Sequence, residues 1–222
     1  MAPTLGYWNI RGLANGIRLM LHYKEVDFED KRYQQGAPPD FSREEWLKDK
    51  FNLGLDFPNL PYLIDGDLKM TETSAIYAYL GRKYALCGST DEARVRNDMV
   101  YSVHVSHRSA FSAVVYNKEF ETLKGPFVES LPGRLESLSK FLGDHEYFAG
   151  SEIVYADFCV YDLLDMLNVF SPGCLDKYDN LKAFLARVES LPTVKKFLDS
   201  DGYMKRGPFN GAIAQWGGVV VP

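Results

Sequence analysis

The histidines are the residues of this chain best suited to bind a metal or move a proton, and their spacing favours neither role. There are four of them, His22, His104, His107 and His145. His104 and His107 lie three residues apart on an expected helix, but no nearby cysteine or carboxylate completes a metal-ligand set. We therefore predict histidines on solvated helix surfaces and no metal site.

The cysteines and the common catalytic motifs exclude further kinds of chemistry. Cys87, Cys159 and Cys174 are odd in number and have no C-x-x-C spacing. This argues against a disulfide framework or a zinc site and favours a reducing cytosol. The sequence also contains no dinucleotide fingerprint, P-loop, H-E-x-x-H or G-x-S-x-G motif, which removes several large classes of enzyme.

Tyr7 stands in an apolar run, residues 5–10, that is long enough for a buried strand. A tyrosine in such a strand usually packs in the core, with its hydroxyl bonded to some partner. The pattern alone therefore favours packing over catalysis for Tyr7, and any chemical role depends on the neighbouring residues.

The first part of the chain alternates strand-like and helix-like segments. Apolar residues share one face of a predicted helix over residues 15–23, and residues 26–33 are a weaker strand candidate. Ser42 and Glu45 have the spacing of a capping box at the start of a short helix, and Thr73 is predicted to cap a later one that ends near residue 84. A hairpin is predicted between these helices, with strands over residues 61–64 and 68–71 and a turn at residues 65–66.

Helical spacing dominates from about residue 91, where strand signals vanish. Helices are predicted near residues 91–116, 126–142, 155–170 and 180–190, with Pro132, Pro172 and Pro192 marking breaks between them. The predicted organisation is therefore a small α/β domain over residues 1–84, a linker over residues 85–90, and an all-helical domain over residues 91–222.

The composition is that of a folded protein of the cytosol. A chain of 222 residues that is 46% hydrophobic can bury a substantial core. Its formal net charge of −5, without a long run of one sign, does not favour nucleic acid as a partner. We see neither a signal peptide nor an apolar stretch near the ~18 residues of a membrane span, so we expect a cytoplasmic protein with no membrane partner.

Several segments of the chain are informative when they are taken together. They are Gly6-Tyr7-Trp8, Ile10-Arg11-Gly12-Leu13, residues 39–46, residues 52–62 and Tyr155-Ala156-Asp157-Phe158. In order and spacing they resemble the mu-class cytosolic glutathione transferases. The similarity extends over essentially the whole chain, including residues 174–176 and 208–209. It implies a thioredoxin-like α/β N-terminal domain followed by an all-α C-terminal domain, in agreement with the predicted order of elements. It also implies a transferase that joins the glutathione sulfur to hydrophobic electrophiles, which is a detoxification activity.

The resemblance gives Tyr7 the catalytic role, as the tyrosine that donates its hydroxyl hydrogen to the glutathione sulfur. A thiol with a pKa near 8.5 is only a few per cent thiolate at neutral pH, so a donor that favours the anion raises the reactive fraction. Glutathione is then a co-substrate, and no further cofactor is implied.

The resemblance also assigns the binding site of glutathione. Arg43, Trp46 and Lys50, in the pattern R-x-x-W-x-x-x-K, are implied to lie by the glycyl carboxylate. Asn59 and Leu60 precede Pro61, whose cis peptide bond in the family lets the Leu60 backbone pair with the cysteinyl unit. Trp8 and Leu13 border the same site. Thr73 is implied to bind the γ-glutamyl carboxylate at a helix N-terminus, although a purely capping role is the alternative.

The electrophile is implied to bind beside the thiolate, against Ile10, Leu13, Tyr116 and Phe209. Core packing is the alternative for all four, and helical spacing alone favours it for Tyr116. The resemblance instead makes the Tyr116 hydroxyl a candidate group for activating the electrophile. Arg108, together with Ser109 and Ser112, makes this wall of the pocket more polar than expected.

Four positions depart from the family pattern. Glu72-Thr73 stands where mu-class chains usually have Gln-Ser, and Ser106 stands where a partner subunit's aspartate usually helps bind the γ-glutamyl ammonium. Our hypothesis is that Glu72 binds this ammonium. Val154 replaces a threonine that caps a core helix, so half of a capping box that includes Asp157 is missing.

The resemblance implies a homodimer in which Phe57 inserts into the partner subunit. An aromatic on a protruding loop is hard to explain in a monomer, although a core position is the alternative. A non-catalytic carrier of hydrophobic ligands and a catalytically inactive relative are the competing functions. The presence of Tyr7, Arg43, Trp46, Lys50 and Asn59 argues against the inactive relative. The physiological electrophile is not predicted.

Overall fold

A four-stranded sheet forms the first part of the molecule. The computed structural model describes residues 2–219, and its strands are arranged in the order β2-β1-β3-β4. β1 is parallel to β2 and antiparallel to β3, which is antiparallel to β4. β1 is therefore paired on both edges, and its apolar residues form the centre of this part of the core. The strands are β1 Thr4–Trp8, β2 Glu29–Tyr33, β3 Tyr62–Asp65 and β4 Leu68–Thr71.

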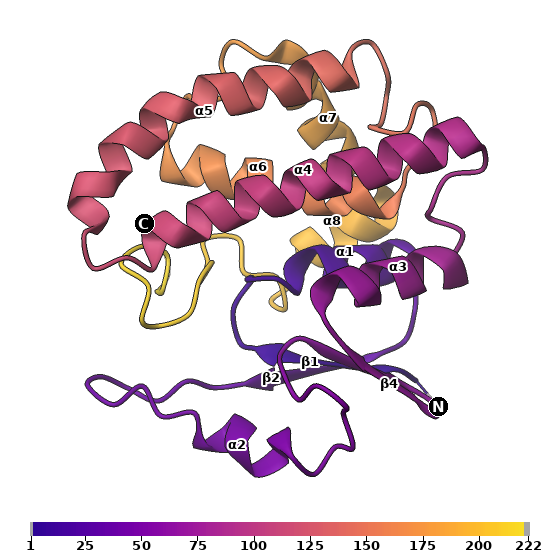
Figure 1. The fold of residues 1–222 in the computed structure, drawn as a ribbon. Coiled ribbons are helices and arrows are strands. Elements are labelled where there is room, and N and C mark those ends of the chain that lie inside the picture. Colours follow the sequence, from indigo (N-terminus) through magenta and orange to yellow (C-terminus); the bar gives the residue numbers. More distant parts are fainter. Residues whose placement is uncertain (1, 220–222) are drawn as a thin grey trace.

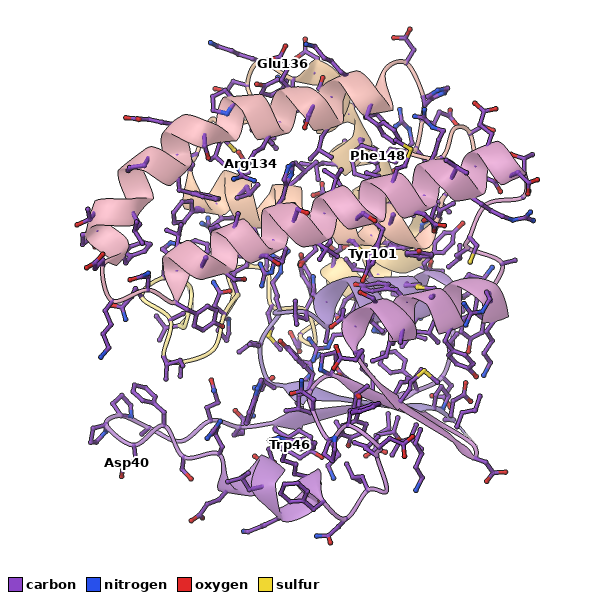
Figure 2. All side chains as sticks on the ribbon, viewed as in Figure 1. Asp40, Trp46, Tyr101, Arg134, Glu136 and Phe148 are labelled. Carbon is purple, nitrogen blue, oxygen red and sulfur yellow. The ribbon has the colours of Figure 1, made fainter. Side chains whose placement is uncertain are left out.

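Helices cover both faces of the sheet. Figure 1 shows α1 (Asn15–Tyr23) and α3 (Thr73–Lys83) on one face and α2 (Glu44–Lys50) on the other. Trp46 lies between α2 and the sheet (Figure 2). Its ring stacks on Tyr62 and meets the ring of Tyr33 edge to face, which fixes α2 to the sheet. This is the thioredoxin-like α/β arrangement that was predicted.

The second part of the chain is helical and packs against the sheet domain through α1. α6 lies at its centre, is buried along most of its length, and contacts α1, α4 and α7. Tyr101 lies where α4 faces α3 (Figure 2). Its hydroxyl donates a hydrogen bond to Ser74 at the start of α3. The two parts therefore share a continuous interface. The helices are α4 Asp91–Val115, α5 Phe120–Leu142, α6 Tyr155–Phe170, α7 Asp179–Ser190 and α8 Pro192–Leu198.

Most predicted elements are confirmed, α1 and α6 with the predicted bounds. β1 ends earlier and β2 begins later than predicted, and the hairpin turn falls at residues 66–67 because Asp65 pairs with Leu68. α8 was not predicted. α3 and α4 are separated by residues 84–90, at the place where the linker was predicted.

The prediction that Pro132 ends or begins a helix is wrong. α5 begins at Phe120 and continues through both Pro126 and Pro132. An internal proline costs a helix ~3 kcal/mol. Each large apolar side chain that the helix buries contributes about 1.5–3 kcal/mol in return. The buried face of α5 carries enough of them to outweigh both prolines, namely Phe120, Phe127, Leu131, Leu135, Leu138 and Leu142.

Two predicted helix caps are also wrong. The N-cap of α3 is Glu72, so Thr73 is the first helical residue and makes no capping bond through its side chain. The predicted capping box at Ser42 and Glu45 does not form as a reciprocal pair. The Ser42 hydroxyl accepts the Glu44 amide at 3.3 Å, but Arg43 is the N-cap of α2 and the Glu45 carboxylate accepts the Gln34 amide at 2.6 Å.

As predicted, the capping box of α6 lacks a side-chain acceptor at its N-cap, and only the half supplied by Asp157 forms. Val154 is the N-cap and offers no side-chain acceptor. The buried Asp157 carboxylate accepts the Val154 amide at 2.7 Å and the Phe148 amide at 2.9 Å. Burial raises the pKa of Asp157 to about 7, although both backbone hydrogen bonds oppose the shift. Asp157 therefore fixes the loop that leads into α6.

Candidate active site

Strand pairing brings several predicted site segments together at one end of the sheet, where β1 and β2 finish and β3 begins. Gly6 lies opposite Tyr62 in the antiparallel pair, so the residues that follow Gly6 lie beside Leu60 and Pro61. Trp8 lies opposite Tyr33 on the other side, and their rings meet edge to face. The Leu60–Pro61 peptide bond is cis, as the resemblance implied.

Tyr7 lies at this end of the sheet, and a backbone amide holds its hydroxyl. Its side chain is 6% exposed, and its oxygen accepts the backbone N–H of Leu13 at 3.1 Å. Burial raises the pKa of Tyr7, although the Leu13 amide and the Arg108 guanidinium oppose the shift. The hydroxyl therefore keeps its proton at neutral pH, and the bond from Leu13 leaves that proton free to be donated elsewhere.

Gly12 is required for this contact. Its φ angle is +48°, a conformation that favours glycine. A Cβ atom at this position would lie 2.5 Å from the ring and 2.6 Å from the hydroxyl oxygen of Tyr7. The loop before α1 can therefore approach Tyr7 only because residue 12 has no side chain.

The residues predicted to bind the glycyl end of glutathione lie on and beside α2. Arg43 is exposed and makes no ion pair with any residue that the structure describes. Lys50 is half-buried, and its ammonium lies 5.2 Å from the centre of the Phe51 ring. Trp46 is only 5% exposed, because Tyr33 and Tyr62 cover most of its ring. The two cations are therefore free to bind an anion, whereas Trp46 is chiefly a packing residue that can offer one edge.

The residues predicted to bind the rest of glutathione lie between β3 and α3. Asn59 is exposed and Leu60 is buried. Glu72 is exposed and has a φ angle of +67°, which is unusual for a residue other than glycine. Thr73, the first residue of α3, lines a narrow crevice together with Leu13 and Arg108. This crevice brings together residues from β4–α3, the loop before α1, and α4.

The predicted electrophile-binding residues are not equally accessible. Ile10 lines a pocket with Trp8 and Pro208 at the end of β1, and Leu13 is 40% exposed. Tyr116 is 42% exposed and follows α4, and its hydroxyl accepts the Gly211 amide at 2.6 Å. Leu13 and Tyr116 are therefore open to a ligand, whereas Ile10 is only 7% exposed and offers little surface.

Phe209 and Arg108 are almost fully buried. Phe209 is 1% exposed and stacks on Trp216, with the Arg11 guanidinium 4.6 Å from its ring centre. Arg108 is 7% exposed, donates to Asn210 at 3.3 Å, and has a buried Nε without a protein partner among the described residues. Phe209 thus supports the wall of the pocket from behind, whereas Arg108 keeps one donor unused.

Sequence reasoning gave no role to the buried charges behind this site. Arg11 is 1% exposed and pairs with Asp162 and Asp165 of α6, each at 2.6 Å. Arg18 is also 1% exposed, pairs with Asp30, and donates to the Ile10 carbonyl at 2.7 Å. The available signal was the placement of charged residues inside otherwise apolar segments, because buried charges are rare unless they are paired.

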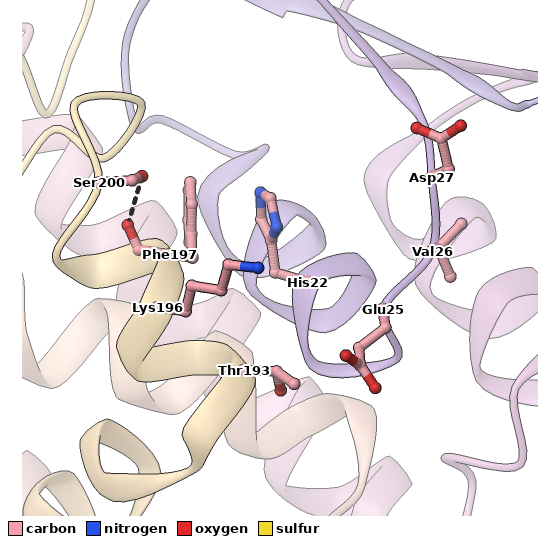
Figure 3. A pocket seen from close by; sticks show the side chains of 8 residues that line it. All are labelled: His22, Glu25, Val26, Asp27, Thr193, Lys196, Phe197 and Ser200. Atoms are coloured by element: carbon pink, nitrogen blue, oxygen red, sulfur yellow. Dashed lines mark hydrogen bonds between the residues drawn. The ribbon is translucent and has the colours of Figure 1, made fainter.

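A hollow outside the candidate site lies between the end of α1 and α8 (Figure 3). His22 lines it and stacks on Phe197 with ring centres 3.9 Å apart. Burial lowers the pKa of His22. Figure 3 also shows Lys196 facing the hollow from α8, with Glu25 and Asp27 on the α1 side. None of the predicted site residues lines it.

Residues 2–219 contain no group of three or more histidine, cysteine or acidic side chains arranged to hold a metal ion. None of the helices in the same range combines the length and the apolar character that a membrane span requires.

Comparisons with known proteins cover both parts of the chain. The model of the glutathione S-transferase N-terminal domain matches residues 3–82, and that of the C-terminal domain matches residues 106–201. The glutathione S-transferase Blo t 8 has a similar structure, with a TM-score of 0.88 and 35% identity over 96% of this chain and 99% of its own. A pi-class enzyme of Onchocerca volvulus has a TM-score of 0.84 and 30% identity over 97% and 100% of the two chains.

Curated relatives specify the class. Glutathione S-transferase Mu 7 of Rattus norvegicus is 48% identical over 217 residues, which are 98% of this chain and 99% of the relative. Glutathione S-transferase Mu 1 of Homo sapiens is 45% identical over the same shares of the two chains. With the fold and the arrangement around Tyr7, these similarities show that the chain belongs to the mu-class glutathione S-transferases.

Proposed function

We propose that this transferase ionises the thiol of glutathione with the Tyr7 hydroxyl and joins the sulfur to hydrophobic electrophiles. The observation that carries the proposal is the Leu13 amide, 3.1 Å from the Tyr7 oxygen. This bond occupies an acceptor position of the hydroxyl, so the hydrogen is directed to a sulfur that lies across from Leu13. Class membership supports conjugation rather than a non-catalytic carrier role.

In the reaction, Tyr7 is a donor and glutathione is the nucleophile. The thiol gives its proton to solvent, and the thiolate accepts the hydrogen bond from Tyr7. The sulfur then forms a bond to the electrophilic carbon, and the leaving group departs with its electron pair. Leu13 and the small exposed part of Ile10 supply the apolar surface for the electrophile, and Tyr116 can donate its hydroxyl hydrogen to it, because its oxygen already accepts from Gly211. Arg108 lines the crevice beside Leu13 and is proposed as a second polar group for this pocket, and the buried Phe209 supports its wall.

Glutathione is proposed to lie along the sheet edge, from α2 to the start of α3. Arg43, Lys50 and the edge of Trp46 suit the glycyl carboxylate, since both cations are accessible. Trp8, Asn59 and the Leu60 backbone adjoin the middle of the tripeptide. Thr73 offers free backbone N–H groups at the α3 N-terminus to the γ-glutamyl carboxylate, and Glu72 offers a carboxylate to the ammonium.

The proposed assembly is a homodimer of cytoplasmic subunits, each with a glutathione-binding domain (residues 1–84), a linker (85–90) and a helical domain (91–222). Val95, Met99 and Val103 recur every four residues on α4 and are between 38% and 56% exposed. Phe57 is 75% exposed. Such exposed apolar side chains support an interface with a second copy. Replacing Phe57 with serine is expected to shift the protein toward monomer in sedimentation experiments, and an unchanged dimer would contradict its role.

Turnover of glutathione with an aryl halide near neutral pH tests the proposed activity, with Tyr7→Phe as the variant. We expect activity in the native protein, a loss on the order of a hundredfold in kcat/KM for Tyr7→Phe, and retention of both proteins on a glutathione-affinity column. Retention without turnover in the native protein would instead favour the carrier. Equal activity of the two proteins would refute the role of Tyr7.

A further inference from the structure

The loop between β1 and α1 carries the amide that holds Tyr7, and it is fixed at several points. Three hydrogen bonds fasten the backbone of residues 10–12. The Arg11 amide donates to Pro208 at 2.8 Å, the Gly12 amide donates to Phe209 at 2.9 Å, and the Ile10 carbonyl accepts from Arg18 at 2.7 Å. The position of the Leu13 amide therefore depends on parts of the chain that are distant in sequence.

The side chain of Arg11 adds the strongest of these attachments. Its Nε and Nη2 donate to one oxygen of Asp162 at 3.0 and 2.6 Å, and its Nη1 donates to Asp165 at 2.6 Å. Asn15, in the first turn of α1, donates to the same Asp162 oxygen at 2.6 Å. One buried guanidinium thus links the loop of the sheet domain to two carboxylates of the central helix α6.

This link is directional, and an apolar contact could not replace it. A guanidinium presents its donors in a rigid planar fork, so two carboxylates fix both its position and its orientation. The cation also lies over the ring of Phe209, whose carbonyl accepts the Gly12 amide. Arg11 is almost completely buried, so the side chain is screened from a ligand and can affect one only through the loop.

We propose that Arg11 is a positioning residue for glutathione transfer, because it fastens residues 10–13 to α6 and so aims the Leu13 amide at the Tyr7 hydroxyl. The inference rests on the role proposed above for Tyr7. Without Arg11 the loop loses its attachment to α6, the Tyr7 hydroxyl is free to rotate, and the thiolate loses part of its stabilisation. The affinity for glutathione changes little, because its polar ends bind elsewhere on the sheet edge.

The experiment is a titration of the bound glutathione thiol, followed by the ultraviolet absorbance of the thiolate, in Arg11→Met, Arg11→Lys and the native protein. Arg96→Met is the matched control, because Arg96 is partly buried, donates to the Phe141 and Phe148 carbonyls, and lies over the Phe141 ring. We expect Arg11→Met to raise the thiol pKa and to lower kcat/KM near pH 6.5 by about tenfold, the factor for one hydrogen bond lost in the transition state. Arg11→Lys should recover part of both effects, and Arg96→Met should leave the thiol pKa unchanged.

An unchanged thiol pKa in folded Arg11→Met would overturn the inference, and so would an equal change in Arg96→Met. Tyr7→Phe, measured alongside, separates this outcome from a failure of the proposed function, because only the latter leaves the thiol pKa unchanged in Tyr7→Phe. If Arg11→Met does not fold, Asp165→Asn removes one anchor of the fork at a site that is 27% exposed. A smaller rise in the thiol pKa then supports the inference, and no rise contradicts it.

Discussion

The centre of the proposed glutathione site and its rim differ in how far their polar groups are already fixed. At the centre, where the sulfur would lie, the Tyr7 hydroxyl is buried and bonded to Leu13, and Arg11 behind it is paired with two carboxylates. On the rim, Arg43 near the glycyl end and Glu72 near the γ-glutamyl end are exposed and make no ion pair with any described residue. The donor that would stabilise the thiolate is therefore fixed before glutathione binds, whereas the charged groups that would bind its ends are not.

This difference follows from the physical requirements of the two tasks. A donor that stabilises a thiolate must be aimed before the reaction, because preorganised donors need no rearrangement in the transition state. Charged groups that bind a mobile tripeptide can remain in water until the ligand arrives, and exposed ion pairs contribute only about 0–1 kcal/mol each. Substitutions around the buried Tyr7 hydroxyl should therefore have large effects on activity, and substitutions of the exposed charged residues on the rim should have small ones.

Gly12→Ala should have the largest effect. The new Cβ would overlap the Tyr7 ring, and a displacement of about 1 Å near the reacting atoms can cost on the order of a hundredfold in rate. We expect that loss in kcat/KM, measured with saturating electrophile. Gly66→Ala is the matched control, because Gly66 has a similar φ angle of +62° but no neighbour within 4 Å of its Cβ position. Equal losses in the two variants would mean that backbone strain, and not contact with Tyr7, causes the effect.

Asp157→Asn extends the comparison to a buried carboxylate outside the site. Asparagine keeps only one acceptor oxygen, so one of the amides of Val154 and Phe148 loses its partner. The expected loss is about 1–3 kcal/mol in the free energy of unfolding, measured with urea at neutral pH. A variant as stable as the native protein would show that water replaces the lost acceptor.

The same variant gives a test with pH. Burial raises the pKa of Asp157 to about 7 in the folded protein, above ~3.9 in the unfolded chain. The folded state therefore holds the proton of Asp157 more tightly than the unfolded chain does. The resulting contribution to the free energy of unfolding is complete below about pH 4 and declines as the pH rises to about 7. The stability advantage of the native protein over Asp157→Asn should shrink across this window. An advantage that grows with pH would mean that the two amide bonds outweigh burial.

Glu72→Gln should have an intermediate effect, at the rim of the site. If Glu72 binds the γ-glutamyl ammonium, its replacement should raise the dissociation constant of glutathione by about tenfold, the lower range for a hydrogen bond to a charged group. Calorimetry of glutathione binding measures this change, with Glu44→Gln on α2 as an exposed control. An unchanged dissociation constant would leave the ammonium to another group.

Arg43→Ala should have the smallest effect. As one of two accessible cations near the glycyl end, Arg43 is expected to contribute about 0.2–1 kcal/mol, and less at high ionic strength. The KM for glutathione should therefore rise only a few-fold, with kcat unchanged, and the rise should diminish in high salt. A large fall in kcat would contradict the view that the exposed residues on the rim bind glutathione without affecting the chemistry at Tyr7.

The fold could be predicted from the sequence where local signals and tertiary packing agree. α1 and α6 have strong apolar periodicity and were predicted with their observed bounds. α5 was misjudged because its prolines are local signals, whereas the burial of Phe127, Leu131 and their neighbours is a tertiary effect that outweighs them. The predictions for the two caps were wrong for a similar reason. The Glu45 carboxylate binds the Gln34 amide and not the amide of Ser42, and Glu72 replaces Thr73 as the N-cap of α3.

The candidate site was predicted from resemblance, and its supporting contacts were not predicted. No periodicity shows that the Leu13 amide reaches Tyr7, because that contact depends on the positive φ of Gly12 and on the loop path. The pairing of Arg11 with Asp162 joins residues 151 positions apart. Only a folded structure brings such groups together, although the aspartates in the otherwise apolar segment of α6 indicate that they must have partners.

The pKa of the glutathione thiol, titrated in complexes with the native protein and with Tyr7→Phe, tests the central claim most directly. The account predicts a pKa clearly below the free thiol value of about 8.5 in the native complex, and a value close to 8.5 when only the hydroxyl is removed. The same pKa in both complexes would contradict it, because the thiolate would then be stabilised by groups other than Tyr7.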